Sequence, residues 1–233
     1  MIILSAKAQH LLNRGNLRDV IIVLATIFSL TGPEPDLIVY LVPLGVLTAG
    51  CSLHFIVKGQ LIRNVVLCTE GAYAIVRHPY YLANFLVDCA FCLLSLNLYL
   101  IVAYPFLFFW AYGPHIRQEE QRLARKHPEQ FYTYSTTVPQ IFPDSNSIRN
   151  VKKLLQNKSF SRITSNEIKR ISRFFAVACF IILCQEIKTD SWQELAPWHT
   201  SIGYDDVLMV ELFLSLFLYS LIGRRRKRND FVG

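Results

Sequence analysis

The chain has 233 residues, of which 52% are hydrophobic and only 18% are charged, and its mean hydropathy is +0.31. A soluble domain of this length usually buries less apolar surface, so the composition predicts a membrane protein. The formal net charge is +7. In a membrane protein such a charge reflects orientation in the bilayer, and we expect no nucleic-acid partner.

Apolar runs separated by polar breaks predict an all-α, polytopic fold with five to six transmembrane helices, forming a single membrane domain over residues 1–233. Only the second run reaches the ~20 residues expected of an untilted crossing, and the first is the weakest. A tight turn at "SLNLY" would join the third run to the fourth. The runs are 18–31, 37–57, 80–96, 98–113, 171–187 and 206–223.

The positions of Lys and Arg predict the orientation, because cytoplasmic loops retain these residues. With the spans above, 23 of the 24 Lys and Arg residues fall on one side, and only Lys188 falls on the other. Both termini are therefore expected in the cytoplasm, and the "RRRKR" tail is interpreted as a stop-transfer anchor. The membrane would be the inner membrane of a bacterial cell, or the endoplasmic reticulum of a eukaryotic one.

The longest polar segment, 114–170, is expected to be cytosolic and helical. Its first part should continue the fourth span as an exposed helix through Lys126, until Pro128 ends it. Its second part, 148–155, alternates apolar and basic faces, as an interfacial helix on an anionic leaflet does. Thr164 to Glu167 then fits a capping box at the start of the fifth span.

Cysteine usage indicates neither a disulfide framework nor a metal site. Five of the six cysteines lie inside apolar runs and Cys68 lies in a cytoplasmic loop, where thiols stay reduced. Cys89 and Cys92 form a C-x-x-C pair, but without a second pair nearby they are interpreted as core residues. No cleavable signal is recognised before the first span.

Two motifs carry the functional signal. "GAYAIVRHPYYLANF" is followed about 35 residues later by "EEQRLARKHPEQFYTYSTTVPQIFP". Together they resemble the integral-membrane methyltransferases related to isoprenylcysteine carboxyl methyltransferase and to the phospholipid methyltransferases. The resemblance covers residues 60–143, the expected catalytic core, and leaves 171–223 as an additional C-terminal helix pair. The matching residues are Gly71, Tyr73, Arg77, His78, Pro79 and Tyr81, then Glu119, Glu120, Leu123, Tyr134, Val138, Pro139 and Pro143.

The resemblance implies an S-adenosylmethionine-dependent methyltransferase that releases S-adenosylhomocysteine. The donor carries a sulfonium, an ammonium and a carboxylate, so its site needs carboxylates, a cation or helix N-terminus, and an aromatic wall. A Pro in the first turn of a helix leaves free backbone N–H groups behind it. The residues expected to bind the donor are Tyr73, Arg77, His78, Pro79, Tyr81, Glu119 and Glu120.

Catalytic roles are assigned to His78, Glu120 and Asp88. Methyl transfer needs mainly in-line positioning, and a base only if the acceptor is protonated, so His78 or one glutamate is the base candidate. Asp88 and Asn84 lie four residues apart inside the third span. A carboxylate within a membrane is functional by default, so Asp88 is assigned a role either in contacting the substrate or in pairing two helices.

The acceptor is expected to be a lipid or another membrane-soluble molecule, entering laterally from the bilayer. Gln140 stands where these families usually have Arg after Val-Pro, which argues mildly against a carboxyl acceptor. Prenylated cysteine, phosphatidylethanolamine and a small hydrophobic thiol or amine all stay open. So do two other functions, an NADPH-dependent membrane reductase of the sterol reductase type and a non-enzymatic membrane module. Nothing in the sequence indicates the oligomeric state.

Overall fold

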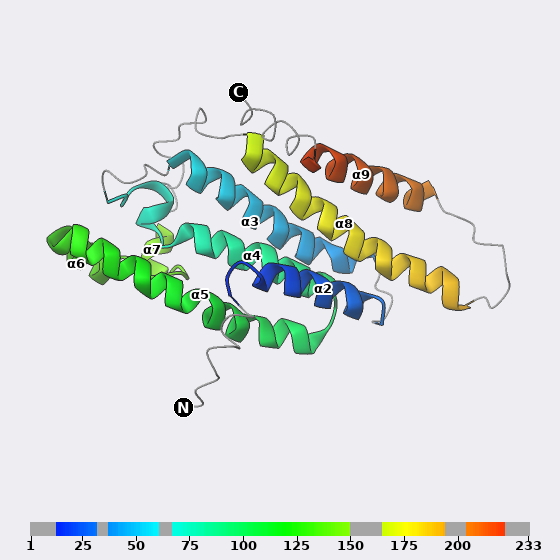
Figure 1. Ribbon diagram of the computed structural model, residues 1–233, viewed down its shortest axis with the longest axis horizontal. Helices are drawn as coiled ribbons and strands as arrows, with labels where there is room; N and C mark the ends of the chain where they lie inside the picture. The colour runs from blue at the N-terminus through cyan, green and yellow to red at the C-terminus, as the bar shows by residue number, and fades with distance from the viewer. Residues whose placement is uncertain (1–12, 32–36, 61–66, 150–164, 194–203, 222–233) are drawn as a thin grey trace, which may run out of the picture. The chain divides into compact units, whose positions relative to one another are not determined.

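The computed structural model describes residues 13–31, 37–60, 67–149, 165–193 and 204–221, and Figure 1 shows the order of their helices along the chain. The described residues form helices, turns and loops without strands, so the all-α prediction is confirmed. The elements are α2 (Leu17–Ser29), η1 (Leu37–Tyr40), α3 (Leu41–Gln60), η2 (Gly71–Ala74), α4 (Pro79–Leu94), α5 (Leu98–Lys126), α6 (Pro128–Thr137), α7 (Ser145–Ile148), α8 (Ser165–Gln193) and α9 (Tyr204–Leu221).

Proline and the polar caps place the helix ends close to the expected positions. α4 begins at Pro79, whose missing N–H costs nothing in a first turn. α5 runs without interruption to Lys126, and the next helix starts at Pro128, as predicted. Between α4 and α5, Leu96 has a φ of 53° and Asn97 caps α5 by accepting a hydrogen bond from the Leu100 N–H at 3.0 Å. These residues make the predicted tight turn.

One helical segment among the described residues, Ile38–Gln60, is long and apolar enough to cross a membrane, and Pro79–Leu94 is a shorter apolar helix. The five-to-six span count therefore stays a prediction, as does the orientation. Large apolar side chains on several helices are nevertheless exposed, including Ile38 at 70% and Phe106 at 74%. Contiguous exposed apolar surface marks a membrane or partner interface.

The chain divides into two compact units. Unit 1 contains the described residues 13–18, 48–60, 67–86 and 105–149, and unit 2 contains 19–31, 37–47, 87–104, 165–193 and 204–221. Helices α2, α3, α4 and α5 each contribute one part to each unit. Every residue of the two sequence motifs lies in unit 1, so the site is described within that unit.

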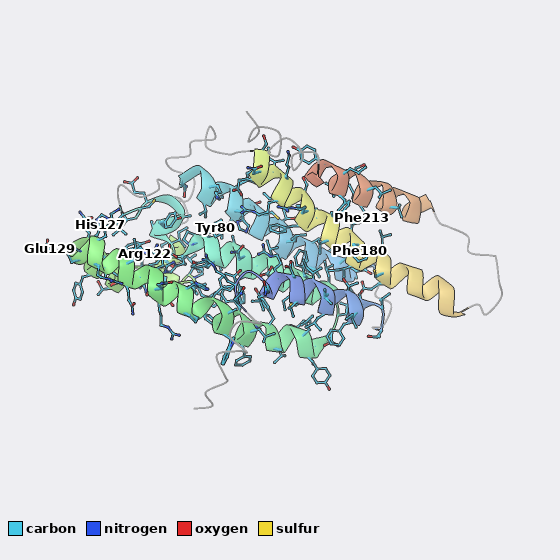
Figure 2. All side chains as sticks on the ribbon, in the orientation of Figure 1. Tyr80, Arg122, His127, Glu129, Phe180 and Phe213 are labelled. Carbon is cyan, nitrogen blue, oxygen red and sulfur yellow. The ribbon has the colours of Figure 1, made fainter. Side chains whose placement is uncertain are left out.

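Unit 2 is held by aromatic contacts and by one buried amide. Phe180 of α8 and Phe213 of α9 approach one another with ring centroids 5.7 Å apart, where the two helices pack side by side (Figure 2). The buried Gln185 side chain accepts from the Tyr40 hydroxyl at 2.9 Å and donates to the Leu94 carbonyl at 2.9 Å. Both polar ends of the amide are thus satisfied, as a buried amide requires.

Three sequence expectations fall wholly or partly on residues that the structure does not describe. The interfacial helix over 148–155 lies almost wholly outside the described ranges, since α7 ends at Ile148. The capping box from Thr164 to Glu167 and the "RRRKR" tail are likewise outside them in whole or in part. These stay predictions.

Candidate functional site

The glycine of the first motif permits a tight approach between the turn and α3. Gly71 has a φ of 63°, a conformation that L side chains rarely adopt, and a Cβ there would lie 2.4 Å from the Gln60 side chain. Gln60 Oε1 accepts from the Ala72 N–H at 2.8 Å. The turn from Gly71 is therefore fixed against the end of α3, and it leads directly into the Arg77-His78-Pro79 sequence.

Arg77 caps the C-terminus of α6. Its Nη1 donates to the carbonyls of Ser135 and Val138 at 2.7 and 2.8 Å. Helix C-terminal carbonyls lack partners within the helix and carry partial negative charge, so a guanidinium suits them. Its Nε donates to Glu120 Oε1 at 2.9 Å. Arg77 thus joins α6 to α5, and this ties the first motif to the second.

Glu120 is the centre of this network. Its Oε1 accepts from both Arg77 and the His78 ring, the latter at 3.2 Å, and its Oε2 accepts from Gln140 Nε2 at 2.9 Å. The backbone supports the same arrangement, because the N–H groups of Arg77 and His78 donate to the carbonyls of Pro139 and Gln140 at 2.8 and 3.0 Å. Gln140 therefore supports a carboxylate of the protein, so its identity gives no direct evidence about the acceptor.

The Glu120 network predicts a specific acid sensitivity. Burial disfavours the charged carboxylate, but the hydrogen bonds from His78 and Gln140 and the charge of Arg77 outweigh it, so the pKa of Glu120 lies below its ordinary value of 4.5. A carboxyl whose pKa is lowered by folding contributes stability above its unfolded pKa, and this contribution is lost as the pH falls through the folded pKa. We expect the unfolding temperature in detergent to fall below about pH 4.5, and less steeply in Glu120→Gln. Identical pH profiles would contradict this role.

Glu119, although adjacent in sequence, faces a different environment. Its side chain is 47% exposed, and its Oε2 accepts from the Tyr81 hydroxyl at 3.0 Å. Successive residues of an α-helix point about 100° apart, so one glutamate of the pair faces Arg77 and the other faces open space. The two carboxylates predicted as an equivalent pair therefore have separate roles.

His78 connects the two glutamates. It is 5% exposed, its Nε2 lies 3.2 Å from Glu120 Oε1, and its Nδ1 lies 3.9 Å from Glu119 Oε2. A carboxylate only accepts hydrogen bonds, so Nε2 carries the proton that it donates to Glu120. In a neutral ring Nδ1 then holds the lone pair, and it is the atom on the Glu119 side.

A cavity of about 600 Å³ lies in front of these residues. Its volume falls within the range of small-molecule and cofactor sites. Aromatic and charged side chains line it together, which matches the needs of a charged nucleoside ligand. The predicted donor-site residues on its wall are Tyr73, Arg77, His78, Pro79, Tyr81 and Glu119.

Two predicted residues do not line this cavity. Glu120 lies behind its wall and positions Arg77 and His78. Asp88 is fully buried and belongs to unit 2, whereas the cavity lies within unit 1. The neighbouring Asn84 accepts from Arg18 Nη2 at 2.9 Å. The assignment of Asp88 to catalysis therefore stays a prediction.

Several wall residues were not singled out from the sequence. One group lies on α5 at spacings of three and four residues, the spacing of a single helix face, and this pattern was available as a signal. It consists of His115, Gln118, Arg122 and Lys126. Arg14 and Lys58 also line the cavity. Arg14 is more than 60 positions before Tyr81, so no local pattern could connect the two.

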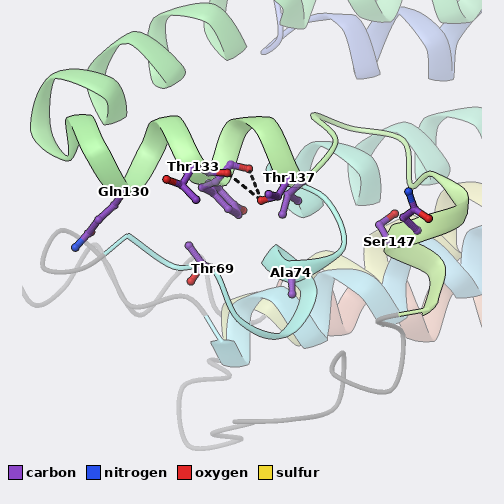
Figure 3. Close-up of a pocket in the computed structure, with 9 residues that line it drawn as sticks. Thr69, Ala74, Gln130, Thr133, Thr137 and Ser147 are labelled. Atoms are coloured by element: carbon purple, nitrogen blue, oxygen red, sulfur yellow. Dashed lines mark hydrogen bonds between the residues drawn. The ribbon is translucent and has the colours of Figure 1, made fainter.

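A second cavity, of about 580 Å³, is lined by residues of α6 and α7 and by Thr69 and Ala74 (Figure 3). No charged side chain lines it among the described residues, and its polar groups are mainly those of Thr69, Gln130, Thr133, Thr137 and Ser147. The Thr137 hydroxyl donates to the Thr133 carbonyl at 3.0 Å, so it is already engaged by its own helix. Among the described residues this cavity therefore has no charged side chain to pair with a sulfonium or a carboxylate.

Comparison with known proteins identifies one family that part of the chain resembles. Residues 38–125 match the family model of the isoprenylcysteine carboxyl methyltransferase (ICMT) family. No curated protein and no solved structure matches the chain. The matched range contains the Arg77-His78-Pro79 motif and both glutamates, and the match favours neither a reductase nor a non-enzymatic module. The match confirms the resemblance over residues 38–125 and supports an S-adenosylmethionine-dependent membrane methyltransferase.

Proposed function

We propose that the chain transfers the methyl group of S-adenosylmethionine to a lipid or other membrane-soluble acceptor, with the donor bound in the 600 Å³ cavity of unit 1. One observation carries the proposal: the family motifs converge on the wall of a single cavity that combines a carboxylate, cations and tyrosine rings. Glu119 supplies negative charge for the sulfonium and ammonium groups. Tyr73 and Tyr81 supply aromatic surface for the adenosine or the sulfonium.

The reaction depends more on the alignment of donor and acceptor than on acid–base catalysis. The acceptor's electron pair attacks the methyl carbon as the carbon–sulfur bond breaks. The electrons of that bond stay on the sulfur and neutralise its charge, so the leaving group is S-adenosylhomocysteine. Because the donor is already activated, the protein contributes by holding both reactants in line. For an acceptor that must lose a proton, Nδ1 of His78 is the base we propose, since Nε2 donates to Glu120.

The apolar composition and the family description support this acceptor class. A prenylated cysteine carboxylate is consistent with both, because Gln140 is bonded to Glu120 and so does not argue against a carboxyl acceptor. A carboxylate attacks without prior deprotonation, whereas an amine needs the base. The pH dependence of turnover with each acceptor distinguishes these cases.

Calorimetric titration of the detergent-purified protein tests the donor site. We expect S-adenosylhomocysteine to bind and NADPH not to bind. His78→Ala should weaken S-adenosylhomocysteine binding about tenfold or more, since it removes a wall residue and one hydrogen bond to Glu120. Thr137→Ala, in the second cavity, is the matched control and should bind normally. Normal affinity in His78→Ala would exclude the assigned cavity, and binding of NADPH alone would favour a reductase.

A further inference from the structure

Three side chains at the cavity form a short array with opposite charges at its ends. The Tyr81 hydroxyl donates to Glu119 Oε2 at 3.0 Å. The Tyr81 hydroxyl oxygen also lies 3.5 Å from Arg14 Nη1, at the outer limit of a hydrogen bond. All three residues line the 600 Å³ cavity and belong to unit 1. An anion and a cation therefore face the same space on either side of one phenol.

This arrangement is complementary to the zwitterion of an α-amino acid. The ammonium and the carboxylate of such a group are attached to the same carbon. A site that binds both therefore needs a negatively charged group and a positively charged hydrogen-bond donor only a few ångström apart. Arginine suits the second task because its planar fork matches a carboxylate. The methionine end of the proposed donor is such a zwitterion.

Arg77, the cation expected from the sequence to hold the donor's polar end, is engaged elsewhere. Its Nε and Nη1 donate to Glu120 and to two carbonyls at the end of α6. Among the described residues Arg14 makes one long hydrogen bond, to Tyr81, and Arg14 is exposed. Rearranging Arg14 toward a ligand therefore costs less than rearranging Arg77.

We propose that Arg14 binds the carboxylate of the donor's methionine moiety while Glu119 binds its ammonium, with Tyr81 holding the two at their spacing. The inference rests on the proposed function, because it assigns a subsite within the same cavity. The inference also extends the proposed donor site, because Arg14 lies before residue 38, outside the range that matches the ICMT family. The turn of residues 13–16 that precedes α2 then supplies a donor-binding residue.

The test removes the carboxylate from the ligand and the guanidinium from the protein in turn. The two ligands are S-adenosylhomocysteine and its decarboxylated analogue, titrated calorimetrically into the detergent-purified full chain. The wild type should prefer the carboxylate-bearing ligand about tenfold or more, as expected for a charge-assisted bond. Arg14→Ala should abolish this preference by weakening only S-adenosylhomocysteine, and Arg14→Lys should keep part of it. Glu119→Gln should weaken both ligands, because both carry the ammonium.

Arg117→Ala is the matched control, since Arg117 is an exposed arginine of α5 that does not line the cavity. It should retain the full preference. Retention of the preference in Arg14→Ala, or an equal loss of both ligands, would overturn the inference and leave the donor site standing. Failure of the wild type to bind S-adenosylhomocysteine would instead overturn the proposed function itself.

Discussion

Replacing Arg77 with methionine is expected to destabilise the protein more than any other single change at the site. The guanidinium is 13% exposed, and it joins Glu120 to the carbonyls of Ser135 and Val138. Its loss leaves the Glu120 carboxylate, which is 18% exposed, without its main counter-charge and the end of α6 without its cap. Removing one partner of a buried ion pair costs about 3–5 kcal/mol. For a chain of this length that corresponds to an unfolding temperature lower by roughly 10 °C.

Thermal unfolding in detergent, followed by tryptophan fluorescence, measures the effect. Arg77→Lys keeps the charge but cannot reach three acceptors in the same geometry, so we expect a smaller loss. Arg117→Met replaces an exposed arginine of α5 and should change the unfolding temperature by no more than about 2 °C. An unfolding temperature for Arg77→Met equal to that of the control would show that the network contributes no stability.

The second large effect is a contrast between two adjacent glutamates. Glu119→Gln should weaken S-adenosylhomocysteine binding by about tenfold to a hundredfold without lowering the unfolding temperature, because Glu119 is 47% exposed and faces the cavity. Glu120→Gln should lower both quantities. Its new amide N–H₂ would face a donor from Arg77, His78 or Gln140, and the Arg77 charge would lose its counter-ion.

The two variants are measured side by side by calorimetry and thermal unfolding. Each is the other's control, since the substitution and the helix are the same. If Glu119→Gln were the destabilised variant and Glu120→Gln the one with a purely ligand-binding defect, the roles assigned here would be reversed. Equal changes in both properties for both variants would mean that the pair acts as a unit.

Much of the local structure followed from the sequence because its causes are local. Pro79 starts α4, Pro128 separates α6 from α5, and Asn97 caps α5 after a tight turn. These ends are set by the absence of a backbone N–H or by a side chain bonding a neighbour's backbone. The resemblance was likewise visible, because both motifs are contiguous stretches, and the match over residues 38–125 confirms it.

What only the tertiary structure decided is which side chains meet. The sequence assigned Arg77 to the donor site; it lines the cavity, and it also bonds groups 43 to 61 positions away, which the sequence did not predict. From the sequence, Glu119 and Glu120 were given the same role. The rotation of α5 about its axis decides which of them faces the cavity, and the sequence does not reveal that rotation. Arg14 was not predicted as a site residue, because its approach to Tyr81 spans 67 positions. Helix ends are determined by residues a few positions away in the sequence. The partners of a charged side chain depend instead on how distant helices pack, and no local sequence pattern encodes that packing.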